Sequence, residues 1–220
     1  MQSSLSRAEL ANYVGRQFDA LFPDGGKTGD LAKLVGQALE RVEHCFSKIG
    51  VKGYADRNGA RFHHRHTDQY AAFLYYLSNS AFDAGSQPVA EKAYALNKAL
   101  HAIDAFYEVR LPAIMLFVHP VGTVLGRAKY SDYFCCYQNC TTGANLEDVY
   151  PVLGRGVVMY GGSRVIGKTE LGDNTFVSTG TIAIDEGTLA PNSVVHGAHP
   201  NAKASPTGRS VVREVFKSGG

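Results

Sequence analysis

The segment HHRH, residues 63 to 66, is the densest group of chemically active side chains in the sequence. Imidazole nitrogens are common metal ligands, so three neighbouring histidines could bind a divalent metal ion. Their spacing fits no standard ligand set, however, and no acidic residue is adjacent. We therefore expect no metal site, and we place HHRH in a solvated loop near the pocket of a small-molecule acceptor.

The cysteines are a second group of candidates, because thiols can bind metals, form disulfides or act as nucleophiles. The four residues are Cys45, Cys135, Cys136 and Cys140. They form no C-x-x-C pair and show no zinc-ligand spacing. We expect buried thiols that act as small apolar residues. The opening MQSSLSRAELANYVG lacks the apolar region of a signal peptide, and no run of 18 apolar residues follows, which predicts a cytoplasmic protein.

Length and charge limit the kinds of partner. A chain of 220 residues makes one large domain or two small ones. Its formal net charge is +2, from 22 basic and 20 acidic residues, so bulk electrostatics favours neither nucleic acid nor an anionic membrane. We expect a small-molecule partner.

Apolar residues recur at helical spacing from the start of the chain to about residue 108, which predicts a helical domain. Four helices are expected, separated by turn residues and by a polar, glycine-containing link over residues 50–66. Their expected N-terminal signals are Ser6, which forms a capping box with Glu9, then Asp30, Thr67 and the pair Ser86 and Pro88.

The second half of the chain has a period of six. Nine apolar anchors share one register: Val118, Val124, Tyr130, Cys136, Leu153, Met159, Val165, Leu171 and Val177. Six fits neither a helix nor an ordinary strand, but three hexads make one triangular coil of a parallel β-helix. Between Cys136 and Leu153 the count is interrupted by residues 142–152, which we expect to form an external loop that contributes to binding.

A helical domain followed by hexads with one external loop resembles the serine acetyltransferases and the wider hexapeptide-repeat acyltransferases. The segment HPVGTVLG, from His119 to Gly126, matches their H-x-x-G-x-V-x-G motif. The resemblance implies a left-handed β-helix, a homotrimer or dimer of trimers, and acetyl transfer from acetyl-CoA. The expected class is α+β, with a helical domain at 1–110, a β-helix at 111–200 and a tail at 201–220.

The same resemblance makes His119 the general base, and the chemistry agrees with that role. Acyl transfer to an alcohol needs a group that removes the hydroxyl proton, and imidazole titrates near ambient pH. An acidic partner would fix its tautomer and stabilise the imidazolium. The family places an aspartate shortly before the first repeats. Here Glu108 and Asp104 are the candidates, and we prefer Glu108 because EVRLP is similar to the family's acidic entry segment.

The resemblance also implies a groove in which the pantetheine arm of coenzyme A lies along small residues of successive coils. The corresponding positions are Gly161, Gly162, Ser163, Thr179, Gly180, Thr181, Gly197 and Ala198, with Lys203 as a candidate for the phosphates.

The acceptor is less well specified, and Tyr150, Asp68 and His66 are the candidates to bind it. Where the family has arginine, histidine and proline in the external loop, this chain has Val149, Tyr150 and Pro151. The charge partners of a substrate carboxylate are therefore missing, so a sugar hydroxyl is at least as plausible as an amino acid. Transfer to the nitrogen of an amino sugar, and a non-catalytic trimeric binding or assembly protein, are the alternatives.

Overall fold

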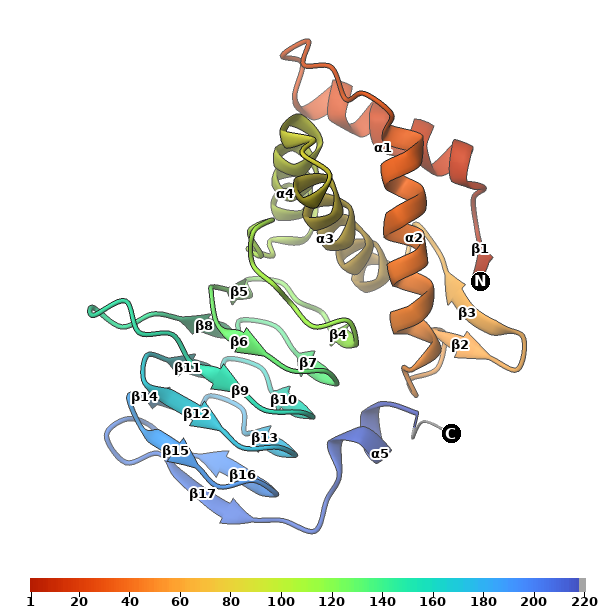
Figure 1. Ribbon diagram of the computed structural model, residues 1–220. Coiled ribbons are helices and arrows are strands. Elements are labelled where there is room, and N and C mark those ends of the chain that lie inside the picture. The colour runs from red at the N-terminus through yellow and green to blue at the C-terminus, as the bar shows by residue number, and fades with distance from the viewer. Residues whose placement is uncertain (218–220) are drawn as a thin grey trace.

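A computed structural model describes residues 1–217 and shows a helical half stacked on a β-helix (Figure 1). The helical half contains the four predicted helices. They are α1 (Arg7–Leu21), α2 (Leu31–Ser47), α3 (Thr67–Asp83) and α4 (Gln87–His101). Among residues 1–217, every helix is too short or too polar to traverse a lipid bilayer.

Local capping explains where these helices begin. The predicted capping box of α1 is present: the Glu9 backbone N–H donates to Ser6 Oγ at 3.3 Å, and Glu9 Oε2 accepts from the Ser6 backbone N–H at 2.8 Å. Asp30 caps α2 as predicted. For α3 the prediction was wrong by one residue: His66 is the N-cap and accepts from the Gln69 backbone N–H, while Thr67 is the first helical residue.

The link between α2 and α3 is more structured than its polar composition predicted. It forms a hairpin of β2 (Ala55–Asp56) and β3 (Gly59–Phe62), and β1 (Gln2–Ser3) pairs with β3 to complete a small sheet. Ala60 and Phe62 alternate inward along β3 and are buried. The strands therefore cover one end of the helical core.

Helix α3 is the central element of the helical half. Every residue from 68 to 81 is buried, because α2 and α4 pack on its sides and the first coil of the β-helix lies against it. A helix enclosed in this way is held rigidly, so polar groups at its ends are positioned by the core.

The β-helix consists of three parallel sheets, one on each side of a triangular coil. The first contains β4 (Met115–Phe117), β7 (Phe134–Cys136), β10 (Val157–Met159), β13 (Thr175–Val177) and β16 (Ser193–His196). The second contains β5 (Val124–Leu125), β8 (Thr141–Gly143), β11 (Arg164–Ile166) and β14 (Ile182–Ile184). The third contains β6 (Lys129–Tyr130), β9 (Val152–Leu153), β12 (Thr169–Leu171) and β15 (Gly187–Leu189).

The hexad register holds in the coils that follow the first one, but not in the first coil itself. Met159 pairs with Val177, and both side chains are fully buried, as predicted. In the first coil, Cys136 pairs with Phe117 and not with Val118. Val124 is likewise not an anchor: it is 41% exposed, whereas Leu125 is 1% exposed.

The shift arises at one corner of the first coil. Eight positions lead from Phe117 to Leu125, whereas six lead from Cys136 to Thr142, the residues paired with them in the next coil. The two additional residues widen this corner, which contains His119, so the anchors on either side cannot both keep the six-residue count.

The external loop and the tail also differ from the prediction. The loop covers residues 144–151 and not 142–152, because Thr142 is buried inside β8 and Val152 begins β9. The tail forms β17 (Lys203–Pro206), antiparallel to β16, and the short helix α5 (Val211–Val215). Phe216 then bridges to Ile49, two residues after α2, so the tail returns to the helical half (Figure 1).

Candidate active site

His119 lies on the wide corner of the first coil, directly after β4. Its φ of 48° is in the left-handed region, which is uncommon for a residue with a side chain. The side chain is 80% exposed and projects from the edge of the β-helix. The corner therefore presents an accessible imidazole on a rigid support.

Asp68, in the first turn of α3, is the carboxylate that contacts His119. Its Oδ2 accepts from the His119 backbone N–H at 3.1 Å and lies 3.7 Å from His119 Nδ1. The Thr67 hydroxyl donates to Oδ1 at 3.4 Å. The Asp68 side chain is only 9% exposed, and the positive end of the helix dipole favours a carboxylate at this position. Asp68 thus holds the corner and leaves His119 Nε2 free.

A small cavity of about 160 Å³ adjoins this pair. Thr67, Asp68 and His119 line it together with Leu100 and His101 at the end of α4. Burial lowers the pKa of His101, an effect that the nearby charge of Asp68 partly opposes. Its Nε2 is buried and has no hydrogen-bond partner in residues 1–217. Sequence reasoning missed His101, because helical periodicity gave no sign that the end of α4 reaches this corner.

The two carboxylates expected beside His119 have other partners. Glu108 accepts from Arg127 at 2.9 Å. Asp104 binds Lys98 at 2.5 Å and accepts from the Tyr94 hydroxyl at 2.8 Å. The structure therefore does not bring Glu108 or Asp104 to His119, because nearer cations hold both side chains.

The residues expected to form the cofactor groove lie along one edge of the β-helix, below His119. Gly161, Gly162, Thr179 and Gly180 occupy successive corners of that edge, and Gly197 and Ala198 follow the next strand of the same sheet. Backbone hydrogen bonds of about 3 Å connect each corner to the one above it. The N–H groups of Asn139, Gly162 and Gly180 donate to the carbonyl oxygens of Val121, Gln138 and Gly161, respectively.

This edge has some, but not all, of the features expected of a groove for the pantetheine arm. A Cβ added at Gly180 would meet nothing within 4 Å, so the space beside this corner is open. Ser163 and Thr181 do not face that space, because their side chains are buried inside the coils. Lys203 is exposed on β17 and pairs with His196. The edge thus offers backbone groups and open space, while the two hydroxyls support the coils.

Of the three acceptor candidates, only Asp68 lies at His119. His66 is used as the N-cap of α3. Tyr150 is exposed in the loop 144–151, which leaves the coil at the next corner, after β8. Within one chain, the structure does not bring Tyr150 to His119.

The other chemically active side chains have structural roles. His63 stacks on His64, whose Nδ1 is 2.9 Å from Ser4 Oγ, and the segment flanks the small sheet. In residues 1–217, no three His, Cys, Asp or Glu side chains are grouped as a metal site would require. All four cysteines are buried free thiols, as predicted, and burial raises the pKa of Cys45 to about 11.

Comparison with known proteins adds to this description. No protein-family model matches the sequence. A putative serine acetyltransferase of Schizosaccharomyces pombe is 23% identical over 133 residues, which are 59% of this chain and 48% of the relative. The serine acetyltransferase of Synechococcus elongatus is 28% identical over 93 residues, 40% of this chain and 38% of the relative. The chain thus spans about half the length of these relatives, or less.

Solved structures match over more of the chain. Soybean serine acetyltransferase complexed with serine superimposes with a TM-score of 0.66 at 17% identity, over 93% of this chain and 85% of that one. The fold is that of the serine acetyltransferases. The Brucella abortus serine acetyltransferase in complex with coenzyme A gives 0.62 at 14% identity, over 92% and 76% of the two chains. The predicted α+β class, a helical domain followed by a left-handed β-helix of the serine acetyltransferase type, is confirmed.

Proposed function

We propose that the protein is an acetyl-CoA-dependent O-acetyltransferase that modifies a hydroxyl of a small acceptor, with His119 as general base. The observation that carries this proposal is the exposed His119 imidazole, set against the buried carboxylate of Asp68, beside a cavity and above an open edge of stacked corners. The serine acetyltransferase fold and the names of the similar proteins support it.

In this proposal His119 moves one proton. As the acceptor oxygen bonds to the thioester carbon and the carbon–sulfur bond breaks, Nε2 takes the hydroxyl proton and delivers it to the departing sulfur. Asp68 faces Nδ1 and stabilises the imidazolium that exists between these two transfers. Asp68 therefore takes the place that the sequence had given to Glu108 or Asp104.

Acetyl-CoA supplies the activated acetyl group, and we place its pantetheine arm along the edge that contains Gly162 and Gly180. Both glycines have positive φ, so their corners turn tightly, and the space beside Gly180 is open. The coenzyme A complex of the Brucella abortus enzyme supports this ligand for the same fold. Lys203 remains the candidate for the phosphates.

The acceptor is a small polar molecule in the cavity of about 160 Å³ between Asp68, His101 and His119. These side chains offer hydrogen bonds and one carboxylate, and among residues 1–217 the lining of the cavity contains no lysine or arginine that could pair with a substrate carboxylate. A sugar or amino alcohol hydroxyl fits this wall. We also propose that Tyr150 of a neighbouring subunit contacts this molecule and that the active unit is a homotrimer or a dimer of trimers. We place the protein in the cytoplasm.

The test measures thiol release from acetyl-CoA with a panel of amino acids, sugars and nucleotide sugars. With an accepted substrate, we expect His119→Asn to lower kcat by about 10²- to 10⁴-fold while the Kd of coenzyme A stays unchanged. Asp68→Asn should lower kcat less, because an orienting carboxylate does not itself take the proton.

Two matched controls decide which carboxylate partners the base. Asp104→Asn and Glu108→Gln should leave kcat within about twofold of wild type, since neither side chain contacts His119. If His119→Asn retains more than about a tenth of the wild-type kcat, the catalytic assignment is wrong. If no acceptor is acetylated, the alternative of a non-catalytic binding or assembly protein replaces the proposal.

A further inference from the structure

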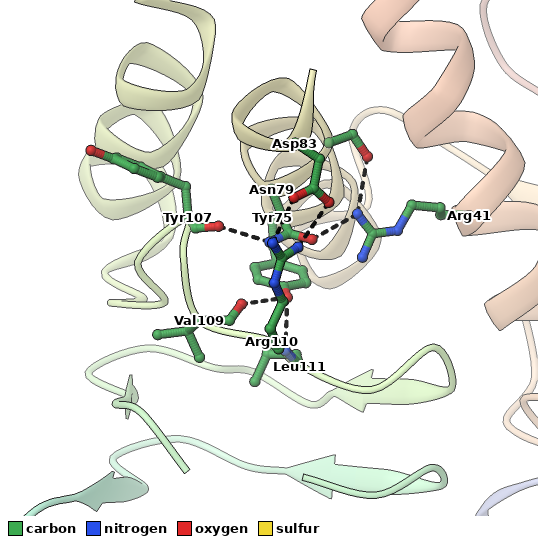
Figure 2. A network of polar contacts seen from close by, with 9 residues as sticks. Arg41, Tyr75, Asn79, Asp83, Tyr107, Val109, Arg110 and Leu111 are labelled. Atoms are coloured by element: carbon green, nitrogen blue, oxygen red, sulfur yellow. Dashed lines mark hydrogen bonds and ion pairs between the residues drawn. The ribbon is translucent and has the colours of Figure 1, made fainter. Parts of the chain in front are cut away.

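Arg41, in the middle of α2, is a partly buried cation without a carboxylate partner in residues 1–217. Its Nη1 donates to Asn79 Oδ1 at 2.9 Å and to Ser80 Oγ at 3.0 Å. The guanidinium carbon lies 4.6 Å from the centre of the Tyr76 ring. Figure 2 shows the guanidinium reaching from α2 toward Asn79 on α3, with its hydrogen bonds leaving from one nitrogen.

The neutral groups that hold Arg41 are themselves fixed. Asn79 is 1% exposed, and its Nδ2 donates to the Tyr107 carbonyl at 2.7 Å, so Oδ1 is turned toward Arg41 (Figure 2). Within the described residues, the hydrogen bonds of Arg41 all leave from Nη1. The N–H groups on Nε and Nη2 are therefore held in place without acceptors, as in a preorganised anion site.

A cavity of about 730 Å³ lies between α2, α3 and the segment that enters the first coil. Arg41 lines it together with Gln37 and His44, one turn away on either side of α2. Leu111 and Ala113 form an apolar part of the wall, and the fully buried Tyr76 lies behind it. The space is large enough for a drug-sized molecule, and it combines one fixed cation with apolar surface.

Both carboxylates on the wall already have cationic partners. Asp83 forms two hydrogen bonds with Arg110, at 2.8 and 2.6 Å, and these lower the pKa of Asp83 (Figure 2). Glu40 is exposed and lies 3.9 Å from Arg7. Arg41 forms no ion pair with a carboxylate of residues 1–217, although its charge contributes to the lowered pKa of Asp83 after the hydrogen bonds from Arg110.

We propose that this cavity binds a small organic acid, with the carboxylate on Nε and Nη2 of Arg41 and an apolar body against Leu111 and Ala113. A planar guanidinium that is already held on one nitrogen matches a carboxylate with its remaining donors. The site is separate from the proposed active site: Ser80 and Asp68 are on the same helix, about 18 Å apart at 1.5 Å per residue.

Calorimetric titration of the full chain with benzoate tests the proposal, with acetate and inorganic phosphate as comparison ligands. Benzoate should bind at least about tenfold more tightly than either comparison ligand, because only benzoate has both the carboxylate and an apolar body. Arg41→Gln should weaken benzoate binding at least about tenfold. Arg57→Gln, which removes an exposed cation in the β2–β3 turn, should leave it unchanged.

A second variant keeps the test decisive if Arg41→Gln fails to fold. Ala84→Phe adds a ring to the cavity wall without removing any group that holds Arg41, and it should abolish benzoate binding. Unchanged binding in a folded Ala84→Phe variant would overturn the proposal, as would the absence of benzoate binding to the wild type. Phosphate binding as tight as that of benzoate would overturn the organic-acid class.

The titration also separates this proposal from the acetyltransferase proposal. Saturating coenzyme A should not displace benzoate, and His119→Asn should bind benzoate like the wild type. Displacement by coenzyme A would place benzoate in the acyl-donor groove and overturn the inference. Failure to acetylate any acceptor, by contrast, would leave Arg41-dependent benzoate binding intact.

Discussion

Asp68 and His119 are 51 positions apart in the chain and belong to different halves of the molecule. Their contact depends on the wide corner after β4 and on the buried first turn of α3. The sequence showed the histidine through its motif, and it placed Asp68 among the candidates for the acceptor. The pairing itself could not be predicted, because no local pattern specifies which helix end packs on which corner.

The buried imidazole of His101 gives a prediction for stability against pH. Burial lowers its pKa in the folded state, so the unfolded state binds more protons as pH falls through about 6.5. The free energy of unfolding should therefore decrease on the acid side of that value. Urea unfolding between pH 5 and 8 should show a shallower decrease for His101→Gln.

His44→Gln is the matched control, since His44 is exposed on α2. Its pH dependence should follow that of the wild type. Equal slopes for His101→Gln and wild type would mean that His101 accepts its proton in the folded state without penalty.

At the scale of elements, the Tyr75 hydroxyl connects the segment between α4 and β4 to α3 through hydrogen bonds. Its hydroxyl donates to the Val109 carbonyl at 2.9 Å and accepts from the Leu111 backbone N–H at 2.8 Å (Figure 2). Tyr75→Phe leaves both buried backbone groups unpaired, so we expect about 2 to 4 kcal/mol lower stability in denaturant unfolding.

Tyr13→Phe serves as the control, because the Tyr13 hydroxyl makes no hydrogen bond with any described residue. It should change stability by less than about 0.5 kcal/mol. A loss in Tyr75→Phe no larger than that in Tyr13→Phe would remove the role assigned to the Tyr75 hydroxyl.

Elements with a long periodic signal were predicted well, and short ones were not. The four helices and the lower coils follow from apolar spacing over many residues. Strands β1 and β2 have two residues each, too few for any period to show. Strand β17 forms because it pairs with the edge of β16, and α5 is held by the bridge from Phe216 to Ile49. No pattern in the tail sequence predicts these tertiary contacts. The register of the first coil failed for a local reason, the two extra residues around His119.

At the scale of the molecule, exposed apolar side chains surround the proposed active site. Leu100, Val121 and Val124 are all exposed near the His119 corner. A second subunit that covers them would remove this apolar surface from water. We therefore expect light scattering to give three times the mass of 23.7 kDa, or a multiple of that trimer. A monomer that still binds coenzyme A would contradict a groove shared between subunits.

The reversal of chain direction at β17 has a consequence for self-assembly. A stack of parallel coils ends in unpaired backbone groups, and such an edge can recruit further chains without limit. Here β17 runs antiparallel along β16 and occupies that edge in the first sheet, while β14 and β15 end the other two sheets with only three residues each. The tail thus covers the edge of β16 with a strand of opposite direction, and we expect a chain that ended before Lys203 to polymerise end to end more readily.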